Sequence, residues 1–172
     1  VDVCMHNLPV RLIANGGGLV YAPLGPTHVA IEDIAIMRAL PNMTIVAPAD
    51  AEEMRRFMDI SLDWPGPIYI RLAKGGDPVV TNPDDGFTIG RGYHLRDANG
   101  GRFGPVLLAA TGVATTRVLV AAELLEQDGI AADVLHLPTV KPLDDELVLR
   151  LAERSPLIVT VEEGTVVGGL GS

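Results

Sequence analysis

The sequence predicts an α/β protein made of two incomplete three-layer units, each with a mainly parallel sheet. Short, continuously apolar segments alternate with amphipathic helical segments, as is typical of parallel strands covered on both faces. From residue 74 to 105 the composition shifts to Gly, Pro, Asp and Asn, which is typical of a connecting segment. We therefore expect one unit over residues 1–75, a linker over 76–105 and a second unit over 106–172. Both ends are expected to be cuts in a longer protein.

The first unit is expected to start with a strand and a glycine turn. Residues 10–14 form a short apolar run that stops at the glycines 16–18. A helix is predicted over 28–40, because Thr27 is a favourable N-cap and Pro41 does not continue a helix.

A strand–helix–strand series then fills the rest of the first unit. Residues 43–47 are apolar, and Asp50 and Glu53 have the spacing of a capping box. The third strand is predicted at 68–72. The helix between the two strands is expected to bury one face, formed by Met54, Phe57, Met58, Ser61 and Leu62.

The second unit repeats the alternation, with strands predicted at 106–110, 132–137 and 157–161. Asp144 is expected to cap a helix that ends near residue 153. Within the linker, a small hairpin is predicted around residues 97–100. A further helix, which ends at Gly129, is expected to bury Val118, Ala121, Ala122 and Leu125.

Composition excludes several classes of protein. The 172 residues carry 22 acidic and 13 basic side chains, a net charge of −9, which disfavours binding to nucleic acid. No apolar run approaches the roughly 18 residues of a membrane span. Cys4 has no partner for an internal disulfide, which fits a cytoplasmic protein. The scattered His6, His94 and His136 have no metal-ligand spacing, so no metal site is predicted in this chain.

His28 is the first candidate site residue. Ligands of open parallel sheets bind beyond the carboxyl ends of the strands, and the segment 25–28 follows the first strand. If Thr27 caps a helix, the helix dipole disfavours an imidazolium at His28, and a neutral ring there donates a hydrogen bond to a developing alkoxide. The alternative is a histidine that only satisfies a turn.

Arg71 is the second candidate, near the end of an otherwise apolar strand. Its guanidinium either pairs with a structural carboxylate or binds a phosphate or carboxylate of a ligand. Glu162 and Glu163 are adjacent in a strand and point to opposite faces, so we expect one structural and one solvated carboxylate rather than a catalytic pair. The glycines at 168–171 match no phosphate-binding pattern.

A series of motifs resembles the transketolase family and covers nearly the whole chain in the family's order. The motifs are GPTH at 25–28, IED at 31–33, RALPN at 38–42, PADAEE at 48–53, GPIYIR at 66–71, VKPLD at 140–144, and VEE with GGLGS within 161–172.

This resemblance implies a pyrimidine-binding thiamine diphosphate fold followed by a transketolase C-terminal-like fold. It implies a transferase, either a transketolase-like carboligase or a relative such as 1-deoxyxylulose-5-phosphate synthase. Such an enzyme moves a two-carbon unit from a ketose or 2-oxo donor to an acceptor. His28 matches the family's histidine beside cofactor and substrate, which implies a catalytic and cofactor-binding role. Arg71 matches the arginine that binds the sugar phosphate.

The resemblance also implies parts that lie outside this chain. The catalytic glutamate precedes the matched region, and the diphosphate and its Mg²⁺ are held by a motif that is absent here. We therefore expect a diphosphate-binding domain or subunit as partner, in a homodimer or heterotetramer, and an inactive fragment. The family's small-molecule donor and acceptor would bind between the two chains.

Two departures from the family's pattern concern substrate recognition. Leu24 replaces the aspartate that precedes the GPTH glycine, and the glycines 16–18 replace a phosphate-binding histidine or arginine. Buried substrate hydroxyls would lose hydrogen bonds there, at about 1–3 kcal/mol each, so an atypical substrate is expected. The alternatives are a 2-oxoacid dehydrogenase E1 β-type component and a non-catalytic interaction subunit.

Overall fold

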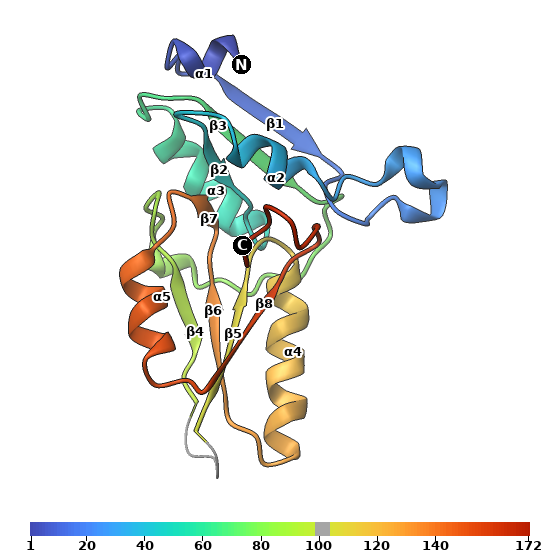
Figure 1. Ribbon diagram of the computed structural model, residues 1–172, viewed down its shortest axis with the longest axis vertical. Coiled ribbons are helices and arrows are strands. Elements are labelled where there is room, and N and C mark those ends of the chain that lie inside the picture. The colour runs from blue at the N-terminus through green and yellow to red at the C-terminus, as the bar shows by residue number, and fades with distance from the viewer. Residues whose placement is uncertain (99–103) are drawn as a thin grey trace.

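The computed structural model describes residues 1–98 and 104–172, which form two four-stranded sheets (Figure 1). The strand order is β1-β3-β2-β7 in the first sheet and β4-β6-β5-β8 in the second. Pairs β1–β3, β2–β3, β5–β6 and β5–β8 are parallel, whereas β2–β7 and β4–β6 are antiparallel. The predicted α/β fold with mainly parallel sheets is confirmed.

The first sheet is built almost entirely from the N-terminal part of the chain. Only its edge strand β7 (Thr139–Lys141) comes from the second unit. The N-terminal elements are α1 (Asp2–Met5), β1 (Arg11–Asn15), η1 (Ala22–Leu24), η2 (Pro26–His28), α2 (Asp33–Arg38), β2 (Thr44–Val46), α3 (Ala51–Ser61) and β3 (Ile68–Leu72).

Helix α3 begins where the capping box predicts. The Asp50 side chain accepts a hydrogen bond from Glu53 N at 2.9 Å, and Glu53 Oε2 accepts one from Ala49 N at 2.7 Å. Two N–H groups at the start of the helix are thereby satisfied. The predicted buried face is correct for Phe57 but wrong for Leu62, which follows the helix and is 73% exposed.

The second sheet is sandwiched between two helices, α4 and α5, which lie on opposite sides of it (Figure 1). Asp144 caps α5 as predicted, since its Oδ1 accepts a hydrogen bond from Leu147 N at 3.0 Å. Gly129, just beyond α4, has φ +76°, which favours glycine. The elements are η3 (Pro83–Asp85), β4 (Tyr93–Arg96), β5 (Val106–Ala110), α4 (Ala114–Gln127), β6 (Ala132–His136), α5 (Asp145–Ala152) and β8 (Leu157–Val161).

The segment 76–105, interpreted as a linker from its composition, contains η3 and β4. The predicted hairpin is wrong in its pairing, because β4 pairs with β6 and not with the next strand, β5. Part of its predicted turn, from residue 99, lies outside the described residues. None of the helices in the described ranges is long and apolar enough to span a membrane.

The two sheets share one apolar core. A single cluster of buried side chains takes residues from both halves of the chain, and strand β7 extends the first sheet from within the second unit. The two parts of the chain therefore pack against each other, in addition to being connected by residues 76–105. Members of the cluster include Ile34, Met43, Ile45 and Tyr69 from the first half and Leu107, Leu135, Leu137, Val140 and Leu147 from the second.

Asp50 ties the connecting segment to helix α3. Besides capping the helix, its Oδ2 accepts hydrogen bonds from Val80 N at 2.8 Å and Thr81 N at 2.9 Å. Burial raises the pKa of this carboxyl, but the hydrogen bonds from Glu53, Val80 and Thr81 outweigh burial and hold it below its usual value of 3.8. The folded structure thus stabilises the ionised form of the Asp50 carboxylate.

Asp50→Asn is expected to lower the free energy of unfolding by about 1–3 kcal/mol near neutral pH, because an amide NH₂ does not accept the bonds from Val80 and Thr81. A lowered folded-state pKa gives stability that is present above the unfolded pKa and disappears as the pH falls through the folded one. Urea unfolding of the parent and of Asp50→Asn at about pH 7 and about pH 3 measures the difference in their free energies of unfolding. An equal difference in stability at the two pH values would contradict the proposed role of the ionised Asp50 carboxylate.

Candidate functional site

The carboxyl ends of strands from both sheets meet where the two units touch. The Ala47 carbonyl, just beyond β2, accepts a hydrogen bond from Gly112 N, just beyond β5, at 3.0 Å. The Glu163 carbonyl, beyond β8, accepts one from Arg71 Nη2 on β3 at 2.5 Å. This junction is where open α/β sheets bind ligands.

His28 lies in a different setting from the predicted one. The helix over 28–40 is wrong in its start: residues 26–28 form the single turn η2, and α2 begins only at Asp33. Between them, Ala30 forms a bridge to Gly18, which leaves Val29 extended and interrupts any helix. His28 is therefore not in the first turn of an α-helix, and the expected helix dipole does not act on its ring.

The His28 ring is nevertheless exposed and oriented. Its Nδ1 lies 3.0 Å from Thr27 Oγ1, and its Nε2 forms no hydrogen bond with any residue that the structure describes. The loop that carries it projects from the end of β1 (Figure 1). One ring nitrogen is thus held by the chain and the other faces outward.

Arg71 is buried, with 7% of its surface exposed. Its Nε donates to Asp33 Oδ2 at 2.9 Å and its Nη2 to the Ala30 carbonyl at 2.9 Å and the Glu163 carbonyl. Burial and the hydrogen bond to Asp33 raise the pKa of the neighbouring Tyr69 hydroxyl. Arg71 therefore has the structural partner that one of the two interpretations required. Only Nη1 forms no hydrogen bond within the described ranges.

The glycine turn makes room for these side chains. A Cβ on Gly17 would lie 2.7 Å from Arg71 Cγ, and a Cβ on Gly18 would lie 2.3 Å from Glu163 Oε2. A Cβ on Gly16 would lie 2.4 Å from the Tyr21 ring. Each glycine is a point of close approach, so the turn packs against the site and does not stand open as a cradle.

Lys74 and Tyr21 are further candidate site residues, which the sequence alone did not indicate. Lys74 follows β3 and is exposed, and its Nζ lies 5.5 Å from the centre of the Tyr21 ring. It lines a cavity of about 220 Å³ together with Asn15 and Asp77. The one feature of the sequence that could have indicated Lys74 is its positive charge, three residues after Arg71. His28 lines none of the cavities described here.

Glu162 and Glu163 follow β8 rather than lying in a strand, and neither is the solvated carboxylate that we expected, because neither is exposed. Glu163 is 8% exposed and pairs with Arg117. Glu162 Oε1 accepts a hydrogen bond from Leu170 N at 2.5 Å. Burial raises the pKa of Glu162, although the Leu170 N–H and nearby arginines act against it. The glycine loop at 168–171 folds over this carboxylate.

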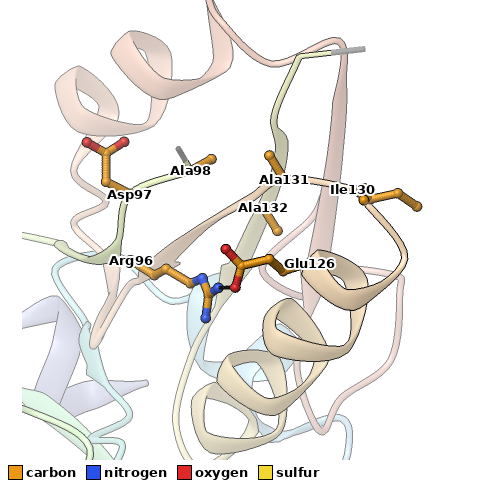
Figure 2. Close-up of a pocket in the computed structure, with 8 residues that line it drawn as sticks. Arg96, Asp97, Ala98, Glu126, Ile130, Ala131 and Ala132 are labelled. Carbon is orange, nitrogen blue, oxygen red and sulfur yellow. Dashed lines mark hydrogen bonds and ion pairs between the residues drawn. The ribbon is translucent and has the colours of Figure 1, made fainter. Parts of the chain in front are cut away.

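Two other clusters lie away from the junction. His94, Asp97 and Asp133 place ligand atoms within 4.8 Å of one another, which the sequence did not predict, but Arg154 already pairs with both aspartates. Figure 2 shows the neighbouring cavity of about 160 Å³, crossed by the ion pair between Arg96 and Glu126. Cys4 is buried and free, as expected.

Comparisons with protein families match both units. Residues 1–76 match the family model described as transketolase, pyrimidine binding domain, and residues 104–172 match the one described as transketolase, C-terminal domain.

Two curated relatives illustrate the match. The 6-deoxy-6-sulfo-D-fructose transketolase subunit SqwH of Clostridium sp. (strain MSTE9) is 38% identical over 100% of this chain and 52% of its own length. The 1-deoxy-D-xylulose-5-phosphate synthase of Synechococcus sp. (strain WH7803) is 40% identical over 99% of this chain and 26% of its own length. The chain thus spans about half or a quarter of these relatives.

Solved structures agree with this match. A structure described as split gene transketolase, inactive beta4 tetramer, superimposes with a TM-score of 0.87 at 40% identity, over 98% of this chain and 52% of that one. A transketolase mutant from Pichia stipitis gives a TM-score of 0.80 at 24% identity, over 96% of this chain and 25% of that one, which supports the fold alone.

Proposed function

Because the chain belongs to the transketolase family, we propose that it contributes to a thiamine diphosphate-dependent transferase. Residues 1–75 form the later part of its pyrimidine-binding domain, 76–105 the linker and 106–172 the start of its C-terminal domain. The enzyme moves a two-carbon unit from a ketose or 2-oxo donor to an acceptor. The observation that carries this proposal is His28, held at Nδ1 and open at Nε2 on a loop beyond β1.

The residues of this chain fit one side of the cofactor only. The loop around His28 is exposed and presents an imidazole, which suits contact with a group held by another domain. In the described ranges, the one group of metal-compatible side chains is His94, Asp97 and Asp133 at β4 and β6, and Arg154 already pairs with both aspartates, so it does not fit a diphosphate with Mg²⁺ at the junction. We place the diphosphate and Mg²⁺ on a partner domain or subunit.

His28 acts as a hydrogen-bond and proton donor to the oxygen that gains charge during the reaction. Thr27 Oγ1 holds Nδ1, so the ring presents Nε2 in a constant orientation. When bound, thiamine diphosphate supplies the electron sink for cleavage of the bond next to the donor carbonyl. The backbone bridge between Gly18 and Ala30 holds the base of the loop.

The donor carries a terminal tetrahedral anion, either phosphate or sulfonate. Arg71 borders the junction with only Nη1 left for a substrate, whereas Lys74 is exposed in a cavity beyond the same strand. We therefore propose that Lys74 binds the anion of the donor. Arg71 holds the surrounding loops and offers its Nη1 as a second donor to the same anion. SqwH is described as acting on a sulfo-sugar, which agrees with such a donor.

Lys74→Ala is expected to raise KM for an anionic ketose about tenfold to hundredfold, because a charge-assisted hydrogen bond is lost. The free energy of unfolding should stay unchanged, since Lys74 is exposed. Arg71→Lys should instead lower stability, as it removes bonds to Asp33, Ala30 and Glu163. Steady-state kinetics and urea unfolding separate the two. An unchanged KM in Lys74→Ala, together with a raised KM and full stability in Arg71→Lys, would show that Arg71 and not Lys74 binds the anion.

The partner is a chain that completes the site, in a homodimer or heterotetramer located in the cytoplasm. A related split transketolase is described as inactive when it forms a tetramer of β subunits, which agrees with a requirement for the other half. Strand β8 also leaves apolar side chains open on the edge of the second sheet, with Leu157 55% and Ile158 46% exposed.

Leu24 supports a second candidate, a decarboxylating component of the 2-oxoacid dehydrogenase E1 β type. Leu24 lies on the His28 loop and is 62% exposed, where an aspartate would otherwise offer an acceptor to a sugar hydroxyl. A small donor such as pyruvate needs no such acceptor.

Product analysis with the assembled protein decides between the candidates. The full-length protein and its diphosphate-binding partner are incubated with thiamine diphosphate, Mg²⁺ and an acceptor aldose. Phosphorylated, sulfonated and uncharged ketoses and pyruvate are supplied in turn. Two-carbon transfer from an anionic ketose supports the main proposal. Turnover of pyruvate alone supports the second candidate, and no turnover despite cofactor binding supports a non-catalytic subunit.

A further inference from the structure

A polar groove on the far side of the second sheet has no role in the proposed reaction. It has a volume of about 400 Å³ and lies between the turn before β4 and helix α5. This size is within the range of small-molecule sites. Arg91, Thr88 and Tyr93 line one wall, and Glu146 and Arg150 line the other.

The two arginines of this groove are distinguished by their lack of partners. Every other arginine in the described part of the chain forms a hydrogen bond or an ion pair through its side chain. Arg91 and Arg150 form none there, although both are exposed to the same cavity. Each guanidinium carries the planar set of N–H donors that suits an oxyanion, and both line the same groove.

Two of the three carboxylates that line the groove already accept hydrogen bonds from the protein. Both oxygens of Asp144 accept backbone hydrogen bonds, from Leu147 N at 3.0 Å and Gly92 N at 2.9 Å. Asp85 Oδ1 accepts one from the Asn82 side chain at 3.3 Å. Glu146 remains as an acceptor suited to hydroxyl groups.

The floor of the groove is held in place by the rest of the fold. Gly90 N donates to Thr139 Oγ1 at 3.2 Å, and Gly92 is packed so closely that a Cβ would lie 2.9 Å from Leu137 Cδ2. His94 is held by Asp133 at 2.8 Å, and the Tyr93 ring stacks on His136. The backbone of the groove is therefore in place before a ligand binds, and only the exposed arginine side chains have to be ordered.

We infer that this groove binds a small hydroxylated anion of the sugar phosphate class. Arg91 and Arg150 hold the phosphate, and Glu146 and Thr88 accept hydrogen bonds from the hydroxyl groups. The groove is separate from the cavities lined by Arg71 and Lys74 and from the loop that carries His28.

Calorimetric titration of the full-length protein with its partner tests this inference. Ribose 5-phosphate is titrated in a Lys74→Ala background, so that the anion subsite proposed for the reaction does not account for the heat. Inorganic phosphate and ribose are titrated as probes of the two halves of the ligand. We expect saturable binding of ribose 5-phosphate, weaker binding of phosphate and none of ribose.

The double variant Arg91→Gln/Arg150→Gln is expected to weaken that binding at least about tenfold. Arg55→Gln is the matched control, because Arg55 is an exposed arginine on α3 and pairs with Glu52. Arg91→Lys/Arg150→Lys should retain part of the affinity, since it keeps the charge. The inference is overturned if ribose 5-phosphate does not bind, if the double variant binds as tightly as the parent, or if Arg55→Gln weakens binding equally.

Discussion

His28→Asn is expected to lower kcat/KM of the assembled enzyme about 100- to 10,000-fold, the usual contribution of the positioned proton donor that we propose. Asn retains a polar group near the position of Nδ1, but it does not reach the position of Nε2 and does not transfer a proton at neutral pH. Because His28 is exposed and Thr27 is its one side-chain partner among the residues that the structure describes, the fold should tolerate the change. Steady-state kinetics with the full-length protein, its partner, thiamine diphosphate and Mg²⁺ measure the effect.

His6→Asn is the matched control, since His6 is exposed at the end of α1 and distant in sequence from the site. It should leave kcat/KM and stability unchanged. Thr27→Val is expected to lower kcat less than His28→Asn, because it only releases the ring at Nδ1. Equal activities of His28→Asn and the parent would remove His28 from the mechanism and favour the histidine that satisfies a turn.

The second large effect concerns a buried polar link between the two units. His136 on β6 is fully buried, and its Nε2 lies 2.8 Å from Glu53 Oε2 on α3. Its Nδ1 lies 2.7 Å from Thr115 Oγ1 on α4. His136→Ala is expected to lower the free energy of unfolding by about 3–5 kcal/mol, because the Glu53 carboxylate is left buried without this partner.

A double-mutant cycle isolates the link from the loss of packing. His136→Ala, Glu53→Ala and the double variant are compared by urea unfolding at one pH. We expect the double variant to be more stable than the sum of the two single effects by about 1–3 kcal/mol. Thr115→Val keeps the shape of the side chain but removes the hydroxyl beside His136 Nδ1, and we expect it to lower the free energy of unfolding less than His136→Ala does. Additivity within about 0.5 kcal/mol would show that the two side chains stabilise the fold independently.

Local patterns predicted much of the fold. The capping residues Asp50 and Asp144 start α3 and α5, and apolar runs mark β2, β3, β5, β6 and β8. These features depend on groups within a few residues of one another, so they are visible in the sequence. The ordered motifs predicted the family in the same way, since they span both units.

The site was predicted only in part. His28 and Arg71 were selected because they follow or end strands, which places them near the carboxyl edge of the first sheet. Their settings were not predictable, because they depend on distant contacts: Arg71 binds the Glu163 carbonyl, 92 residues away, and Ala30 pairs with Gly18 instead of continuing a helix. Lys74 and Tyr21, which are far apart in the sequence, lie side by side only in the folded chain.

The sequence by itself determined the strand and helix segments, the starts of two helices and the family. Only the tertiary structure decided that β7 joins the first sheet, that β4 pairs with β6, and that both units share a core. The physical reason is that hydrogen-bond pairing and burial are satisfied between segments far apart in the chain, and hydrophobic periodicity carries no information about which segments meet.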